Sequence, residues 1–180
     1  MLKTLRTVLL CTALAHAGLA GAAGKPDQPA QYVTDSVSVT GAVERPLQLR
    51  VADLRGFPPQ QIGEVPMVCQ SGANLGKLER LKGVLLRDIL EKATVKAPGH
   101  NDIKKMIVVA GASDGYKVVF SWSEIFNSPV GDGVIVFFEK DGQPLADDEG
   151  RIAMISSKDL RSGPRHVKWL QSLEVLKVVE

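Results

Sequence analysis

The stretch Val65-Pro66-Met67-Val68-Cys69-Gln70-Ser71-Gly72-Ala73-Asn74 is an apolar run that ends in a cysteine and a glycine-containing loop. This pattern predicts a strand that passes into a turn, with Cys69 at the junction. A lone thiol in that position has three interpretations: an inert small hydrophobe, a redox-reactive thiolate or a metal ligand. Free cysteine is among the most buried residue types, so the inert interpretation is the default against which the rest of the chain is weighed.

Residues 1–23 have the pattern of a secretory signal peptide. Lys3 and Arg6 form a basic start, residues 8–19 are apolar, and small residues follow at 20–23. Cys11 lies in the apolar part and would be removed with the leader, so Cys69 has no partner for an internal disulfide. The leader predicts a periplasmic or secreted protein with no membrane span after cleavage.

Cleavage after Ala23 leaves 157 of the 180 residues, the size of one domain with a substantial core. The 22 Lys and Arg residues, less Lys3 and Arg6, equal the 20 Asp and Glu residues, so the mature net charge is close to zero. A nucleic-acid binder needs a basic excess, and this balance argues against one. We expect a flexible lead-in at 24–35 and a single folded domain at 36–180.

Most of the predicted elements are strands. Alternating apolar and polar residues predict strands at 36–43, 47–51 and 116–120. Apolar runs predict further strands at 61–68, 103–110, 134–138 and 151–155, and the segment 167–179 is β-like. The continuous run at 134–138 is typical of a strand that is covered on both faces.

Helices are fewer. Apolar residues recur at helical spacing in the segment 83–93, which predicts an amphipathic helix. Ser121 and Glu124 have the spacing of a capping box for a short second helix. Asp141-Gly142 suits a type I′ hairpin turn. The fold class is therefore α+β, a single β-rich mixed domain.

The segment 158–169 carries a surplus of three positive charges in a neutral protein, since it contains Lys158, Arg161, Arg165 and Lys168 against Asp159. Guanidinium groups suit phosphate and other oxyanions, although a solvated basic loop beside an edge strand has the same composition. His166 alternates with apolar residues and shares a face with Lys168. The only other histidine after the leader is His100, so a metal site built from imidazoles is not expected.

Three stretches, taken together, resemble the molybdopterin-binding domain of the sulfite oxidase family. Residues 163–170, Gly-Pro-Arg-His-Val-Lys-Trp-Leu, resemble its closing motif. Residues 69–74 with 81–90 are similar to its cysteine loop and the helix that follows, and residues 141–145, Asp-Gly-Gln-Pro-Leu, are similar to its hairpin. The similarity runs in the right order from Val37 to Val178.

The resemblance implies a fold and a cofactor. The fold would be of the sulfite-oxidase molybdopterin-binding type, and Cys69 would give its thiolate to molybdenum. Arg165, His166 and Lys168 would hold the anionic phosphate of the molybdopterin, and Asp114 would lie near the pterin. An oxygen atom would move to or from a small oxyanion substrate, with a protein redox partner as the alternative partner.

Three departures keep a second hypothesis open. Residues 24–35 contain no His or Arg, and Asp148-Glu149-Gly150 stands where the family has Asp-His-Gly. The leader has no Arg-Arg pair, although family enzymes outside the cytoplasm are normally exported folded with their cofactor. The alternative to a molybdenum oxidoreductase is thus a cofactor-free domain of the same fold that binds an anionic ligand or a protein. A thiol redox protein is a third interpretation, but it lacks a resolving cysteine.

Overall fold

The computed structural model describes residues 29–178, so the predicted signal peptide and the first part of the predicted lead-in lie outside it. Its strands are β1 Ser36–Gly41, β2 Leu47–Arg50, β3 Gln60–Val68, β4 Asn74–Leu85, β5 Met106–Ala112, β6 Lys117–Ser121, β7 Val134–Lys140, β8 Gln143–Pro144, β9 Ala153–Ser156 and β10 Leu170–Lys177. Its α-helices are α1 Val51–Leu54, α2 Leu86–Ala93 and α3 Trp122–Phe126. Single 3-10 turns span Pro29–Tyr32, Asp102–Lys105, Pro129–Gly133 and Gly163–Arg165.

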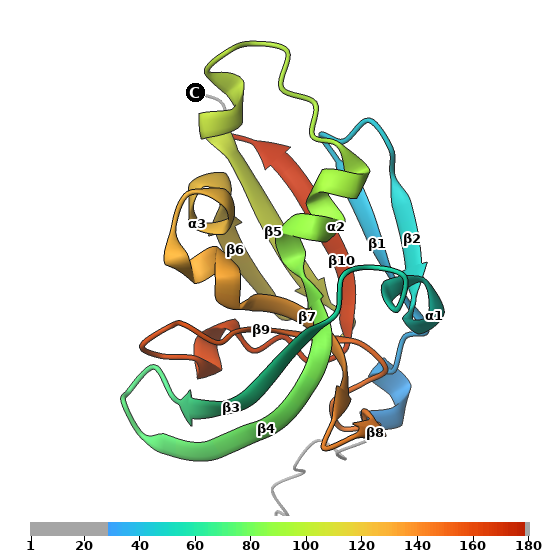
Figure 1. Cartoon of the computed structure of the whole chain (residues 1–180), viewed down its shortest axis with the longest axis vertical. Coiled ribbons are helices and arrows are strands. Elements are labelled where there is room, and N and C mark those ends of the chain that lie inside the picture. The colour runs from blue at the N-terminus through green and yellow to red at the C-terminus, as the bar shows by residue number, and fades with distance from the viewer. Residues whose placement is uncertain (1–28, 179–180) are drawn as a thin grey trace, which may run out of the picture.

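The first sheet has the strand order β2-β1-β10-β5-β6. β10 pairs in parallel with β1 and antiparallel with β5, so the last strand of the described chain lies in the middle of this sheet. Figure 1 shows α2 and α3 in front of this sheet. None of the helices between residues 29 and 178 is long and apolar enough to cross a membrane.

The second sheet has the order β3-β4-β7-β8, and β9 also pairs with β7. β3 and β4 form a long hairpin that sweeps below the first sheet in Figure 1. Since β3 is an edge strand, its backbone groups on one side have no partner within the sheet. The loop that joins β3 to β4 contains Cys69.

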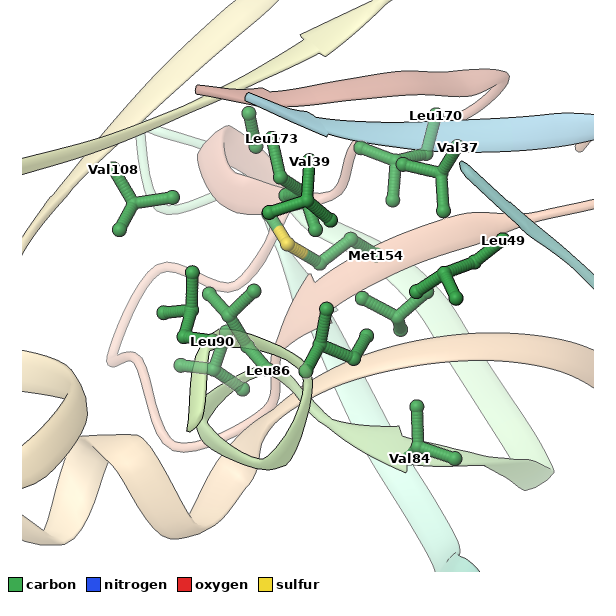
Figure 2. Close-up of a cluster of buried hydrophobic side chains, with 14 of the residues drawn as sticks. Val37, Val39, Leu49, Val84, Leu86, Leu90, Val108, Met154, Leu170 and Leu173 are labelled. Atoms are coloured by element: carbon green, nitrogen blue, oxygen red, sulfur yellow. The ribbon is translucent and has the colours of Figure 1, made fainter. Parts of the chain in front are cut away.

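The main core lies between the first sheet, α2 and β9 (Figure 2). Leu86, Ile89, Leu90 and Ala93 are all buried, which confirms the predicted amphipathic helix. A second apolar cluster joins β3, β4, β7 and β9. The first five residues of β7 are buried, which agrees with the prediction of a strand covered on both faces.

Candidate functional site

Cys69 begins the tight loop that connects β3 to β4. The Cys69 N–H donates to the carbonyl of Ala73 over 2.9 Å, and the Gly72 N–H donates to the carbonyl of Cys69 over 2.9 Å. Gly72 has φ of +93°, a conformation that favours glycine. The Cys69 side chain is half-exposed, so the thiol is not sealed in the core.

The basic segment, residues 158–169, lies against the free edge of β3 immediately before this loop. Ser162 is buried, and its hydroxyl accepts the Val68 N–H over 3.1 Å and donates to the Pro66 carbonyl over 2.5 Å. One hydroxyl therefore satisfies two backbone groups that the sheet leaves unpaired. This contact brings together the cysteine loop and a segment that follows it by roughly a hundred positions.

Two glycines permit the close approach of these segments. A Cβ at Gly163 would lie 2.9 Å from the carbonyl oxygen of Val68 and 3.6 Å from Cα of Cys69. A Cβ at Gly72 would lie 3.1 Å from an Nη atom of Arg161. The Arg161 guanidinium therefore rests against the cysteine loop.

Ser162→Ala tests the docking of the two segments. The substitution leaves the Val68 N–H and the Pro66 carbonyl without their partner, so we expect the free energy of unfolding to fall by about 2 kcal/mol. Urea denaturation measures the change. Ser38→Ala is the control, because its hydroxyl makes one longer bond of 3.3 Å at an exposed site, and we expect a change below about 0.5 kcal/mol. Equal effects of the two substitutions would contradict this account of the docking.

The cysteine loop favours the thiolate form of Cys69. The backbone N–H of Ser71 lowers the pKa of the thiol most, and the Ser71 hydroxyl lowers it further. The positive charge of Arg161 acts in the same direction. A half-exposed thiol with a lowered pKa is a competent metal ligand or nucleophile.

A shallow groove of about 430 Å³ lies beside the cysteine loop, lined in part by Gln70, Lys158, Arg161 and Arg165. Among the described residues, Arg161 makes no ion pair with a carboxylate, whereas Lys158 lies 3.5 Å from an oxygen of Asp132. The groove can therefore offer at least one cation to an anionic ligand near Cys69.

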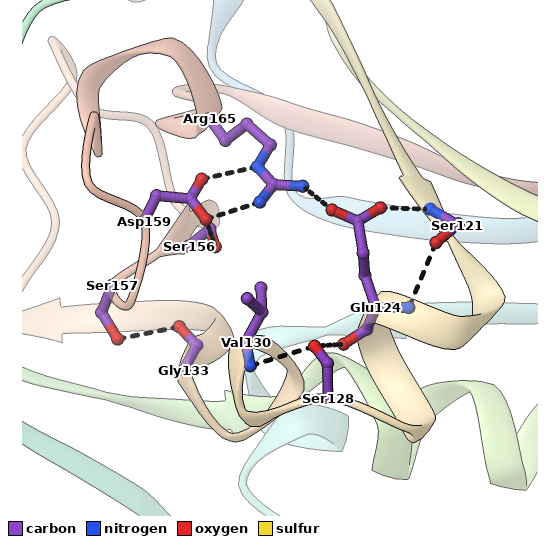
Figure 3. A network of polar contacts seen from close by, with 9 residues as sticks. All are labelled: Ser121, Glu124, Ser128, Val130, Gly133, Ser156, Ser157, Asp159 and Arg165. Carbon is purple, nitrogen blue, oxygen red and sulfur yellow. Dashed lines mark hydrogen bonds and ion pairs between the residues drawn. The ribbon is translucent and has the colours of Figure 1, made fainter.

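Arg165, in contrast, is held in a network of polar contacts (Figure 3). Its guanidinium donates to both carboxylate oxygens of Asp159, over 2.6 and 2.5 Å, and to Glu124 over 3.0 Å. It also lies over the ring of Phe120, 4.3 Å from the centroid. Asp159 accepts a further bond from Ser156, so the network joins β9 to α3 through the basic segment.

His166 and Lys168 both face Glu149. The Nε2 atom of His166 donates to one oxygen of the Glu149 carboxylate, and the Lys168 ammonium lies 3.8 Å from the other. Glu149 is only 3% exposed. The structure thus sets these two basic side chains against the carboxylate of Glu149, the residue that stands where the resemblance to the family predicts a histidine.

The Asp114 carboxylate stabilises the turn in which it lies. One of its carboxylate oxygens accepts the Tyr116 N–H over 2.9 Å, and the Tyr116 hydroxyl donates to the Pro164 carbonyl over 2.6 Å. The turn of Asp114 therefore neighbours the basic segment through Tyr116, while the carboxylate itself is exposed.

The residues of this site meet only some of the requirements of a molybdopterin. The soft, accessible Cys69 thiol suits molybdenum. Within residues 29–178 no cluster of three or more His, Cys, Asp or Glu side chains could hold a metal ion. The basic side chains expected to hold the phosphate, Arg165, His166 and Lys168, each already face a carboxylate of this chain. Cys69 therefore has the chemistry that the molybdenum of such a cofactor would need, whereas the side chains expected at its phosphate are engaged by carboxylates of the chain itself.

Sequence reasoning did not identify Ser162 or the pairing of Glu149. No pattern marks Ser162, because its role depends on the free edge of a strand almost a hundred residues earlier. Glu149 did stand out as an acid in place of a histidine, but its partners become visible only when the turn 146–150 packs against residues 166–169.

Comparisons with known proteins support the predicted family and fold. The family model described as "Oxidoreductase molybdopterin binding domain" matches residues 25–179. The sulfane dehydrogenase SoxCD from Paracoccus pantotrophus has a similar structure, with a TM-score of 0.59 and 21% sequence identity. The match covers 78% of this chain and 37% of that chain, so this protein spans little more than a third of its length. No curated protein sequence matches.

These findings confirm the resemblance to the sulfite oxidase family and the α+β, sheet-rich fold class. Because the family model covers most of the sequence, the chain belongs to the oxidoreductase molybdopterin-binding domain family.

Proposed function

We propose that this protein is an oxidoreductase in which Cys69 supplies a thiolate ligand to the molybdenum of a molybdopterin cofactor. The observation that carries the proposal is the placement of Cys69: half-exposed, on a tight loop that lowers the pKa of its thiol, and beside a groove with a cation. An inert structural cysteine needs none of these features. Molybdenum bound there would supply oxygen-atom transfer coupled to a two-electron change.

The remaining residues of the site have supporting roles in this proposal. Ser71 keeps the Cys69 thiol ready to lose its proton, and Ser162 holds the basic segment against the loop. Arg161 faces the groove and would orient a small oxyanion substrate near the thiolate. The leader pattern at 1–23 leads us to propose further that the protein acts in the periplasm or outside the cell.

Metal analysis of the protein purified from its native host tests the proposal. We expect about one molybdenum per chain, because a single thiolate site is available, and we expect Cys69→Ser to lose it. His100→Ser is a control at an exposed turn and should retain the metal. Molybdenum that persists in Cys69→Ser would contradict the ligand assignment.

One observation favours the alternative of a cofactor-free binding domain. Arg165, His166 and Lys168 are each engaged by carboxylates of the same chain, which reduces what they can offer to a phosphate. A protein exported unfolded would also reach its compartment without a cofactor. The absence of molybdenum from both the native protein and Cys69→Ser would support this alternative and overturn the first proposal.

A further inference from the structure

The turn that carries Glu149 is fastened to the basic segment by its backbone as well as its side chain. The Trp169 N–H donates to the Glu149 carbonyl over 2.8 Å, and the Trp169 indole donates to the Asp147 carbonyl over 2.7 Å. The Lys168 ammonium also donates to the Asp148 carbonyl over 3.2 Å. These bonds fix the position of the Glu149 carboxylate relative to His166 and Lys168.

The charge of the Glu149 carboxylate is compensated by other groups of the same chain. Glu149 is 3% exposed and the His166 side chain 9%, so water reaches neither group freely. The ring of His166 lies against that of Phe137, with centroids 6.2 Å apart. The positive charges of Lys168 and Lys140 also act on Glu149. A buried carboxylate is stable only with such partners, and the partners are thereby occupied.

We propose that Glu149 is a built-in counter-ion that occupies the anion-binding position formed by His166 and Lys168, so that a phosphate group binds there only when the Glu149 charge is removed. A phosphate that bound to His166 and Lys168 would have to expel a hydrogen-bonded carboxylate or lie beside it. Two anions that contact the same basic side chains repel each other strongly, because solvent screening is weak at a buried site. Any phosphate-bearing ligand of this domain must therefore be held elsewhere or displace the 146–150 turn.

This inference does not depend on a metal at Cys69. Molybdenum content reports on the thiolate, and phosphate binding reports on His166 and Lys168. Loss of molybdenum in Cys69→Ser together with phosphate binding by the unaltered protein would preserve the proposed function and overturn the inference. Retention of molybdenum in Cys69→Ser, together with no phosphate binding by the unaltered protein, would overturn the proposed function and preserve the inference.

The experiment is a titration of the full chain with inorganic phosphate at pH 7, at constant ionic strength maintained with chloride, followed by NMR of the histidine rings. In the unaltered protein the His166 signals should show no saturable shift. Glu149→Gln should bind phosphate at least about tenfold more tightly, since removal of an adjacent opposite charge frees a cation. Asp148→Asn is the matched control, because it removes one charge from the same turn at an exposed position.

Two results would overturn the inference. One is a saturable phosphate shift of His166 in the unaltered protein with the affinity of Glu149→Gln. The other is a Glu149→Gln protein that binds phosphate no better than Asp148→Asn. Glu149→Ser removes the same charge with a smaller side chain, and it takes the place of Glu149→Gln if that variant does not fold.

Discussion

Arg165→Ala is expected to lower the free energy of unfolding by about 3 kcal/mol, because it leaves buried carboxylate oxygens without a cation. Asp159 has a side chain that is 12% exposed and depends on Arg165 for a two-pronged ion pair. Glu124 loses its ion pair at the same time. The hydrogen bonds that the Arg165 guanidinium donates, chiefly to Asp159 and then to Glu124, raise its pKa, so it remains charged at any pH used. Urea denaturation measures the loss.

The controls separate a structural clamp from a free ligand-binding cation. Arg161→Ala removes an equal charge from the same segment, but Arg161 is exposed, and we expect a change below about 0.5 kcal/mol. Arg165→Lys should recover only part of the lost stability, since an ammonium does not have the planar, two-donor geometry with which the guanidinium contacts both carboxylate oxygens of Asp159. An Arg165→Ala protein as stable as the unaltered one would show that Arg165 is available for a ligand after all.

Glu149→Gln is expected to be about 2 kcal/mol less stable than the unaltered protein at pH 7, and this difference should vanish in acid. Burial by itself would raise the pKa of Glu149, but the hydrogen bond from His166 and the charges of Lys168 and Lys140 outweigh it and lower the pKa. A carboxyl group with a lowered pKa in the folded state adds stability above its unfolded pKa, near 4.3. That stability is lost as the pH falls through the lower, folded-state pKa.

The measurement is urea denaturation of both proteins from pH 7 to pH 3. The curve of the unaltered protein should fall more steeply than that of Glu149→Gln below about pH 4.5, where the carboxyl group of the unfolded chain begins to take up protons. Asp148→Asn serves again as the control, because its side chain is exposed and its pH profile should follow that of the unaltered protein. A constant difference between the unaltered protein and Glu149→Gln over the whole range would refute the assignment of the charged pair.

Local sequence patterns predicted several elements of the fold correctly. Ser121 and Glu124 form the expected capping box at the start of α3. Asp141 and Gly142 both have positive φ, as the predicted type I′ turn requires. These features depend on residues close together in the chain, so the sequence contains the whole of their physical cause.

Long-range features were less accessible. β4 begins at Asn74, directly after the cysteine loop, whereas the sequence analysis predicted the next regular element only at 83. Residues 74–82 are mostly polar because much of this hairpin is exposed, and its strand form comes from pairing with β3 and β7. Pairing across the sheet outweighed local propensity there.

The candidate site divides in the same way. The sequence singled out Cys69 and the basic segment 158–169, and the structure brings the two together. It could not show how far Arg165, His166 and Lys168 are engaged by carboxylates, because Glu124 and Glu149 come from other parts of the chain. Charge surplus counted along one segment says little about the charge that remains after folding.

The central place of β10 has a consequence for synthesis on the ribosome. Until residues 170–177 have left the ribosome, β1 and β5 each have an unpaired edge at the place that β10 will occupy. These two edges have no partner strand until β10 has been made, and meanwhile they are prone to pair with other chains. This sheet is therefore complete only after residues 170–177 have left the ribosome.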